Sequence, residues 1–222
     1  MISKIIAERL KPYLGLHISL KQFGFLHDRQ ILDVVGIVQE VTHSAKLKRQ
    51  SMISLKLNLE KDYDKVNWSL LRLALLQIGL SFDMVKWMMS CVTTANFAAF
   101  INGTPSETFR VTRGIQQGFL LSPYLFLLII EGLSLLIAQA KTDRKIIGLK
   151  VMGSIYLTHI LFVDNVILFD DGSLLEWLHC KSLINLFCRA SGMIVIPRKS
   201  SFGFLNIAED TIHRIGAHLS YP

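Results

Sequence analysis

One stretch of the sequence could hold a carboxylate on a rigid frame: residues 161–169, which read Leu-Phe-Val-Asp-Asn-Val-Ile-Leu-Phe. Apolar, β-branched and aromatic runs flank Asp164 and Asn165, and such runs predict two short strands joined by a tight turn. Asp and Asn suit that turn because both tolerate left-handed backbone and bond locally to the main chain. A carboxylate at the tip of an apolar hairpin suits a metal ligand held against a sheet. A buried hairpin with a polar tip explains the same stretch without a metal.

The composition predicts one domain, or a domain with a small appendage, with enough length to bury a substantial core. The 222 residues carry a formal net charge of +7, which favours a polyanionic partner such as nucleic acid. Three cysteines form no Cys-x-x-Cys unit, as expected in a reducing compartment without structural zinc or disulfides. Charges near the N-terminus, where a signal peptide keeps its apolar core, argue against secretion. We therefore expect an intracellular protein, nuclear or cytoplasmic.

Residues 119–138 are apolar enough to imitate a membrane span. The segment contains Pro123 and Glu131 at inner positions, and a charged residue near the centre of a spanning helix costs about 2.5–3.5 kcal/mol on insertion scales. We therefore expect a core helix here and no membrane partner.

Hydrophobic periodicity predicts helices interleaved with short strands over the rest of the chain. The expected helices cover residues 3–13 (ending at Pro12), 31–48, 68–77, 82–92, 122–140, 173–191 and 211–219. The expected strands cover residues 52–59, 95–101, 108–111, 148–151, 157–163, 193–196 and 200–204. This alternation of partly antiparallel strands with packing helices indicates an α+β domain.

Local signals mark several turns and helix ends. Asn102-Gly103 predicts a tight hairpin turn. Ser173 with Glu176 three residues later is a capping box, and Gly192 suits a left-handed cap at the end of the same helix. In the helix that follows Ser81, the apolar spacing places Phe82, Val85, Met88, Met89 and Val92 on the inward face.

The order of three motifs resembles the palm of a reverse transcriptase. They read Asn-Leu-Glu-Lys-Asp-Tyr-Asp at residues 58–64, Arg-Gly-Ile-Gln-Gln-Gly-Phe-Leu-Leu-Ser-Pro at residues 113–123 and Phe-Val-Asp-Asn at residues 162–165. Flanking motifs of the same family match within residues 24–33 and 191–200. The likeness is closest to LINE-type (non-LTR) retrotransposons, particularly those abundant in plants, and runs over essentially the whole chain.

This resemblance implies the palm of a right-handed polymerase, an antiparallel sheet backed by helices, with partial fingers. Residues 1–50 would then be the partial fingers, residues 51–205 the palm with motifs A to D, and residues 206–222 a C-terminal helical tail toward a missing thumb. The family is an RNA-directed DNA polymerase (a nucleotidyltransferase) that works on an RNA template and a DNA primer. The chain would be a fragment of such an element.

In the family three aspartates hold two Mg²⁺ ions, which stabilise the attacking and leaving oxygens of an in-line displacement. The matching positions here are Asn58, Asp164 and Asn165, so one carboxylate remains. Losing a unit charge beside a cation costs about 4 kcal/mol at an effective dielectric constant of ~20, and about 1.4 kcal/mol is a factor of ten in rate. We therefore expect weakened Mg²⁺ binding and little or no polymerisation. Asp62 is a candidate replacement, but it should have left the metal-facing side of the strand.

The resemblance also assigns residues to the nucleotide. Tyr63 matches an aromatic residue under the sugar, although an ordinary core tyrosine explains it equally well. Gln117 and Gly118 match nucleotide-side positions, where Gly allows close approach of the backbone. Arg29 and Lys199 match positions that contact phosphates; read alone, they are solvated surface charges.

Other positions depart from the family pattern. Its third motif commonly reads R-Q-G-D-P-L-S-P, whereas Phe119 here replaces the acid and Leu120 the proline. His213 and His218 invite a metal interpretation, but they are five residues apart and do not share a helix face. We expect them to be surface histidines.

Two alternatives to a polymerase stay open. One is a non-catalytic nucleic-acid-binding remnant, suggested by the positive charge and by Arg29, Lys199 and Gln117. The other is the product of a decayed element without selected function, suggested by losses at several unrelated catalytic positions. The main prediction is a LINE-type reverse transcriptase domain with a degenerate catalytic site.

Overall fold

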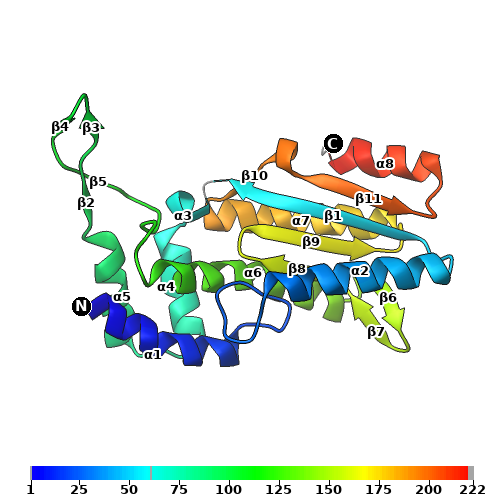
Figure 1. Cartoon of the computed structure of the whole chain (residues 1–222), viewed down its shortest axis with the longest axis horizontal. Helices are drawn as coiled ribbons and strands as arrows, with labels where there is room; N and C mark the ends of the chain where they lie inside the picture. The colour runs from blue at the N-terminus through cyan, green and yellow to red at the C-terminus, as the bar shows by residue number, and fades with distance from the viewer. Residues whose placement is uncertain (1, 61, 220–222) are drawn as a thin grey trace.

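The computed structural model describes the backbone of residues 2–60 and 62–219 and the side chains of residues 4–59 and 63–219 (Figure 1). Its elements in chain order are α1 (Ile2–His17), α2 (Ile31–Leu47), β1 (Met52–Glu60), α3 (Asp62–Lys65), α4 (Trp68–Gln77), α5 (Phe82–Thr93), β2 (Asn96–Phe97), β3 (Phe100–Ile101), β4 (Thr104–Pro105), β5 (Phe109–Arg110), α6 (Ser122–Thr142), β6 (Leu149–Met152), β7 (Ile155–Leu157), β8 (His159–Phe162), β9 (Asn165–Asp170), α7 (Leu174–Ser191), β10 (Ile194–Val195), the 3₁₀ turn η1 (Pro197–Lys199), β11 (Ser201–Leu205) and α8 (Glu209–Leu219).

An antiparallel sheet built on β1 forms the centre of the fold. β1 pairs with β9, and β9 pairs with β8. On its other edge β1 pairs with β11 along its first half and with β10 at its end. The sheet and its helices confirm the predicted α+β, palm-type fold.

The alternation of side chains along β1 divides the sheet into two faces. Ile53, Leu55 and Leu57 are almost completely buried in the main core, which includes the inner side chains of α6 and α7. Met52 points to the opposite face, where it packs with Val34 and other side chains of α2 in a smaller core. Helices thus cover one face fully, while α2 runs along the second (Figure 1).

α6 is the central helix of the main core. Its interior side chains are buried, and even the charged Glu131 is only 5% exposed. Among the described residues it is the one helix long and apolar enough to cross a membrane. Because α4 and α7 both pack against it, its apolar composition is accounted for by the core of this fold.

Two expectations about helices were wrong. α1 does not end at Pro12 but continues to His17. Proline inside a helix costs about 3 kcal/mol or more. The burial of Leu10 and Leu14 in the main core, at about 1.5–3 kcal/mol for each side chain, works against that loss. Phe82 does not face inward: it is 79% exposed at the first position of α5, where the helix has not yet reached the core that buries Val85 and Met88.

The ends of α7 follow the predicted signals with one change. The Ser173 hydroxyl oxygen accepts a hydrogen bond from the Glu176 amide at 3.4 Å, and Gly192 ends the helix in the left-handed conformation. The Glu176 carboxylate does not return to Ser173 but accepts hydrogen bonds from the amides of residues 147–148. Asp170 takes its place and accepts from the Ser173 amide at 2.7 Å.

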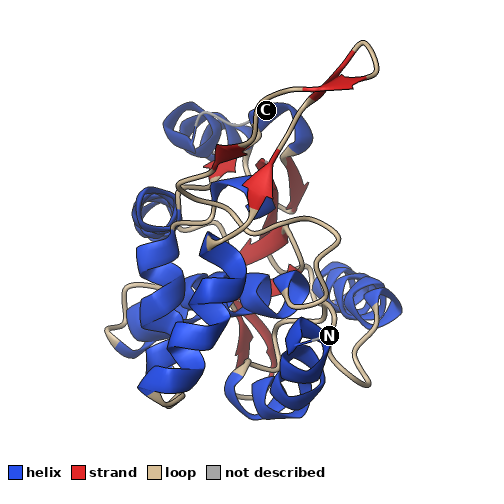
Figure 2. Ribbon diagram, turned by 90° about the vertical axis from the view of Figure 1, so that its left-hand side faces the viewer, coloured by secondary structure: helices blue, strands red, loops and turns tan. Residues whose placement is uncertain are grey.

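The Asn102-Gly103 turn forms as predicted, with positive φ at both residues. β3 and β4 meet there, and β2 and β5 form the stem of the same hairpin. We call residues 96–110 the arm. It extends away from the body of the molecule beyond α5 (Figure 2).

Candidate active site

The structure brings Asn58, Asp164 and Asn165 together at one end of the sheet. Asn58 on β1 is the cross-strand partner of Asn165, the first residue of β9. The Leu59 amide donates a hydrogen bond to the Asp164 carbonyl at 3.2 Å. Asn58 and Asp164 therefore lie side by side, as a metal site shared by the two positions would require.

Both oxygens of the Asp164 carboxylate accept hydrogen bonds from the neighbouring amides. Asn58 Nδ2 donates to Asp164 Oδ2 at 2.8 Å, and Asn165 Nδ2 donates to Asp164 Oδ1 at 2.8 Å. The two asparagines therefore present N–H groups, not oxygen ligands, to the position where a cation would sit. Among the described side chains, no group of three or more His, Cys, Asp or Glu is placed to hold a metal ion. This arrangement does not fit the two-Mg²⁺ site that the family resemblance implies.

The turn that carries Asp164 consists of Val163 and Asp164, because Phe162 and Asn165 already pair as the ends of β8 and β9. Asn165, which was expected in the turn, therefore belongs to the strand. A two-residue hairpin turn requires positive φ, and Val163 has φ of 54°. For a β-branched residue this is a true outlier that costs about 1–3 kcal/mol. The backbone that presents Asp164 is strained.

A pocket of about 660 Å³ opens beside this turn. It brings together four of the predicted site residues, Tyr63, Gln117, Gly118 and Asp164. Its other walls come from Phe25, Phe119, Leu120, Ser122, Pro123, Tyr124 and Val163. Tyr63 also stacks on Phe126, with ring centroids 4.8 Å apart, so it is both a wall of the pocket and a packed aromatic residue.

The segment that carries Gln117 and Gly118 is held against α3 and the start of α4 by hydrogen bonds. The Ile115 amide donates to the Tyr63 carbonyl at 2.8 Å, and the Trp68 indole donates to the Gly114 carbonyl at 2.6 Å. Gly114 has φ of 91°, and a Cβ atom there would lie 2.6 Å from the Asp64 carbonyl oxygen. Glycine is therefore required at this position, which fixes where the segment enters the pocket.

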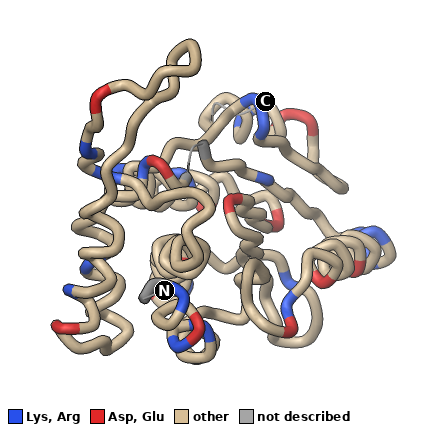
Figure 3. Tube along the Cα trace, turned by 60° about the vertical axis from the view of Figure 1, so that its left-hand side comes forward, with Lys and Arg blue, Asp and Glu red and all other residues tan. Residues whose placement is uncertain are grey.

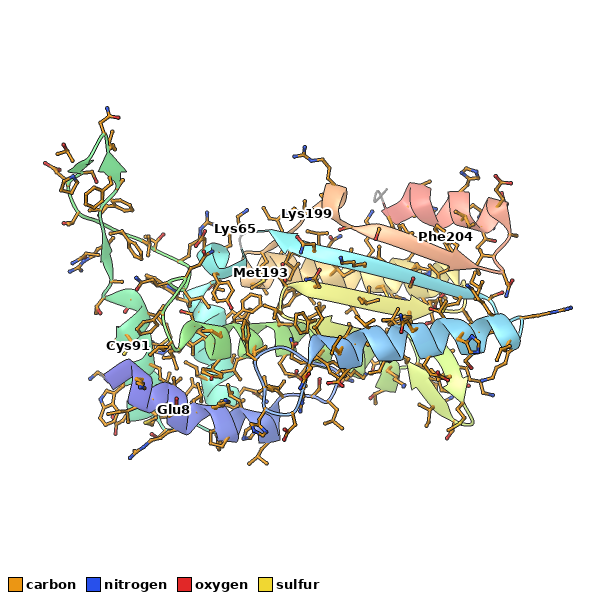
Figure 4. All side chains as sticks on the ribbon, viewed as in Figure 1. Glu8, Lys65, Cys91, Met193, Lys199 and Phe204 are labelled. Atoms are coloured by element: carbon orange, nitrogen blue, oxygen red, sulfur yellow. The ribbon has the colours of Figure 1, made fainter. Side chains whose placement is uncertain are left out.

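Two predicted phosphate-binding residues do not line this pocket. Arg29 Nη1 donates to the carbonyl oxygens of Ser19 at 2.6 Å and Gln22 at 2.7 Å, so its guanidinium supports the loop before α2. Lys199 is exposed on η1, beside the end of β1 (Figure 4). Its segment is tied to the site strand because the Ile196 amide donates to the Asn58 carbonyl at 2.8 Å.

The remaining candidates contribute no ligands to the site. The side chain of Asp62 lies outside the described residues. His213 and His218 are exposed on α8, as predicted. The lysines and arginines are spread over many segments of the chain (Figure 3).

A buried polar cluster lies where β8 meets α6. His159 Nε2 and the Ser134 hydroxyl are 2.9 Å apart, and His159 Nδ1 lies 3.0 Å from the Thr158 hydroxyl. Burial lowers the pKa of His159 to about 3 and raises the pKa of Glu131 to about 7. Burial also lowers the pKa of Lys21 in the same cluster. No local sequence pattern marks this cluster, because its members come from separate elements.

Gln22 is a further residue of the site that was not predicted: it is completely buried, and its side-chain oxygen accepts a hydrogen bond from the Val163 amide in the turn. No local pattern marks it: it lies in a loop, and its partner Val163 is 141 residues away in the sequence.

Comparisons with known proteins place this geometry in context. Residues 1–219 match the sequence profile of the family described as "Reverse transcriptase (RNA-dependent DNA polymerase)". The chain is 20% identical over 219 residues to the Retrovirus-related Pol polyprotein from type-1 retrotransposable element R2 of Popillia japonica, covering 91% of this chain and 30% of that protein. It is 27% identical over 165 residues to the Transposon TX1 uncharacterized 149 kDa protein of Xenopus laevis, covering 73% of this chain and 13% of that protein.

Solved structures of telomerase share the fold. Apo telomerase from Candida tropicalis, truncated from its C-terminal domain, superposes with a TM-score of 0.63 at 14% identity, covering 94% of this chain and 40% of that one. Telomerase from Candida albicans in complex with a TWJ fragment of telomeric RNA gives a TM-score of 0.63 at 12% identity, covering 95% of this chain and 35% of that one. At these identities the likeness concerns the palm-type fold alone.

Proposed function

This chain belongs to the reverse transcriptase (RNA-dependent DNA polymerase) family, in its LINE-type, non-LTR branch, and on that premise we propose that it binds an RNA template paired with a DNA primer but extends the primer little or not at all. One observation carries the proposal: both oxygens of Asp164 are hydrogen-bonded to the amides of Asn58 and Asn165. Those amides stand where the family resemblance requires carboxylates.

The physical reason is the charge of the site. A pair of Mg²⁺ ions, when bound by three carboxylates, supplies the charge stabilisation of the displacement. Here a single carboxylate remains, and its lone pairs already accept two hydrogen bonds. Each missing charge costs about 4 kcal/mol at an effective dielectric constant of ~20. Two such losses reduce the rate by several orders of magnitude.

The pocket supports the binding part of the proposal. Tyr63 offers a ring on which a sugar can rest, and Gly118 leaves room for a nucleotide to approach the backbone. Phe119 and exposed Leu120 make the entrance more apolar than an acid and a proline would. The net charge of +7 supplies long-range attraction for a polyanion.

The division of the chain into subdomains and its cellular compartment are part of the same proposal. Residues 1–50 contribute partial fingers, residues 51–205 the palm, and residues 206–222 a helical tail. The three cysteines Cys91, Cys180 and Cys188 are free thiols, which suits an intracellular, reducing compartment. The chain spans 30% of the R2 polyprotein and 13% of the TX1 protein, so these roles concern the domain alone.

The test combines binding and extension on one preparation. Fluorescence anisotropy with a labelled RNA template–DNA primer, repeated over a range of salt concentrations, should show binding that weakens steeply with salt, because phosphate contacts release counterions. Primer extension with Mg²⁺ and then Mn²⁺ should stay at background. Efficient extension by the wild-type chain would refute the proposal.

The positive charge favours a second candidate, a nucleic-acid-binding remnant that has lost its preference for a primer end. The same anisotropy assay separates the two. A template–primer that binds no better than the two unpaired strands supports the remnant, whereas a preference for the paired primer end supports the polymerase-derived site. Absence of salt-dependent binding to any nucleic acid contradicts both.

A further inference from the structure

Gln22 is a buried polar side chain that hydrogen-bonds to the strained turn at the site. Its side chain has no exposed surface. Gln22 Oε1 accepts a hydrogen bond from the Gly24 amide at 2.9 Å and a second from the Val163 amide at 3.3 Å. A single side-chain oxygen therefore joins the loop before α2 to the residue that precedes Asp164.

The main chain around Gln22 is docked against the same hairpin. Gln22 forms a parallel bridge with Leu161 of β8. The Phe23 amide donates to the Leu161 carbonyl at 2.9 Å, and the Leu161 amide donates to the Lys21 carbonyl at 2.8 Å. These hydrogen bonds fix the position of the Gln22 backbone relative to β8, and its side chain extends from there to the turn.

The fit between the loop and the turn leaves no spare space. A Cβ atom at Gly24 would lie 2.7 Å from Val163 Cγ2 and 3.1 Å from the Val163 nitrogen. Val163 itself holds φ of 54°, which is unfavourable for a β-branched residue. Such a conformation persists only where the surroundings over-determine it.

The Gln22 amide nitrogen adds an independent observation. Within the described part of the chain, Nε2 of Gln22 is buried without a hydrogen-bond partner. An unmet buried donor costs about 1–3 kcal/mol. The oxygen end of the side chain must offset that cost, and its partners are the two amides at the site.

We propose that Gln22 is a positioning residue for Asp164: its side-chain oxygen holds the Val163–Asp164 turn in the strained conformation that presents the carboxylate between β1 and β9. The role deepens, and rests on, the proposed function, because it concerns the geometry of the same site. It also joins the fingers-side loop to the palm hairpin. A shift of that loop therefore moves the carboxylate.

The test uses three substitutions in the full chain. Gln22→Met keeps the length of the side chain and removes the acceptor. Gln22→Glu keeps an acceptor oxygen in the same place. Ile184→Ala, in the buried face of α7, removes core volume without removing any hydrogen bond of Gln22, and it serves as the control for lost stability.

The first measurement needs no metal. Amide hydrogen exchange of Val163, compared with exchange of the amides in β1, should speed up in Gln22→Met more than the change in global stability explains. Gln22→Glu should retain the wild-type ratio of the Val163 exchange rate to the β1 exchange rates. Ile184→Ala should speed up the exchange of all these amides together. Unchanged relative protection of Val163 in Gln22→Met would overturn the inference.

The second measurement places the same substitutions in the background Asn58→Asp with Asn165→Asp and follows Mn²⁺ affinity by calorimetry. Gln22→Met should weaken Mn²⁺ binding about 10–100-fold, the loss typical of residues that orient metal ligands. Gln22→Glu should restore most of it, and Ile184→Ala should leave it unchanged. Equal affinity in Gln22→Met contradicts the positioning role. If the background itself binds no Mn²⁺, the proposed site fails, and the exchange of Val163 alone decides the role of Gln22.

Discussion

At the scale of single residues, the chemistry of the site depends on the difference between an amide and a carboxylate. Aspartate and asparagine have nearly the same shape, so Asn58 and Asn165 keep the packing of a metal-binding strand pair. Their N–H groups point toward Asp164 and form two hydrogen bonds of 2.8 Å. Hydrogen bonds to a charged group are each worth about 1.5–3 kcal/mol. Three carboxylates at these positions would repel one another, whereas the two amides and one carboxylate satisfy each other's hydrogen bonds.

Restoring both carboxylates should reverse this. Asn58→Asp combined with Asn165→Asp should recover divalent-metal binding, because three carboxylates then crowd one position on rigid strands and a cation relieves their repulsion. Polymerisation should stay low, because Phe119 and Leu120 alter the segment that places the nucleotide, and rate depends on near-attack geometry. Calorimetry with Mg²⁺ and primer extension on an RNA template measure the two effects.

The control is a chain with the same added charge elsewhere, Asn102→Asp with Asn206→Asp, both at exposed turn positions. It should bind metal no better than wild type. If the site revertant behaves like this control, residues 58, 164 and 165 do not form a metal site. If the revertant extends primers efficiently, the changes at Phe119 and Leu120 are harmless.

Asp170, at the far end of β9, predicts a pH dependence of stability. Burial, reinforced by the nearby Glu176, raises the pKa of Asp170 to about 8. The unfolded value is about 3.9, so the stabilising contribution of the protonated form is complete below about pH 4 and is lost as the pH rises through about 8. Asp170→Asn keeps the acceptor for the amides of Gly172 and Ser173 and removes the titration.

Urea unfolding between pH 5 and pH 8.5 checks this. The wild type should lose stability across that range, with a slope of at most about 1.4 kcal/mol per pH unit for one proton, and Asp170→Asn should lose distinctly less. Glu131, whose pKa is also raised, leaves a residual slope in both chains. Parallel curves for the two proteins would show that Asp170 does not titrate in this range.

At the scale of elements, the loop before α2 and the β8–β9 hairpin act as one unit. Gly24→Ala should destabilise the protein by about 1–3 kcal/mol, because the new Cβ would lie 2.7 Å from Val163 Cγ2 and 3.1 Å from the Val163 nitrogen, in the strained turn. Gly36→Ala is the matched control: it lies in α2 with nothing within 4 Å of the added atom. That substitution should stabilise the protein by about 1 kcal/mol through helix propensity. Thermal unfolding of both variants gives the comparison, and equal shifts would contradict the tight fit.

Elements with strong local signals could be predicted from the sequence. Hydrophobic periodicity predicts β1 and α4, and the apolar runs around Asp164 and Asn165 predict the β8–β9 hairpin. The pairing of Asn58 with the hairpin followed from the family resemblance. Tertiary contacts decide the rest, so the sequence could not predict it. This applies to the residues of the turn, to the continuation of α1 past Pro12 and to the positions of Arg29 and Lys199.

At the scale of the whole molecule, the N-terminal segment and the palm share one core. Leu10, Leu14 and Ile18 are buried in the same cluster as the inner side chains of α6. The segment after them bridges to β8 through Gln22, and α2 covers the second face of the sheet. The described part of this segment, residues 2–50, therefore packs as one body with the sheet. The arm is the opposite case, since Phe100 is 77% and Ile101 63% exposed at its end.

Two deletions test this contrast. A chain lacking residues 1–50 should fail to fold cooperatively, because each large apolar side chain removed from a core costs about 2–5 kcal/mol and the total stability of a domain is about 5–15 kcal/mol. A chain whose arm is shortened by replacing residues 99–107 with a tight Asn-Gly turn should keep its free energy of unfolding within about 1 kcal/mol, since the β2–β5 stem remains and the lost residues are mostly exposed. Far-UV circular dichroism during urea unfolding measures both. A cooperative transition in the chain without residues 1–50 would mean that the palm holds a self-sufficient core and that the shared cluster is a docked interface. A large loss of stability on shortening the arm would mean that its apolar end packs against the body in solution.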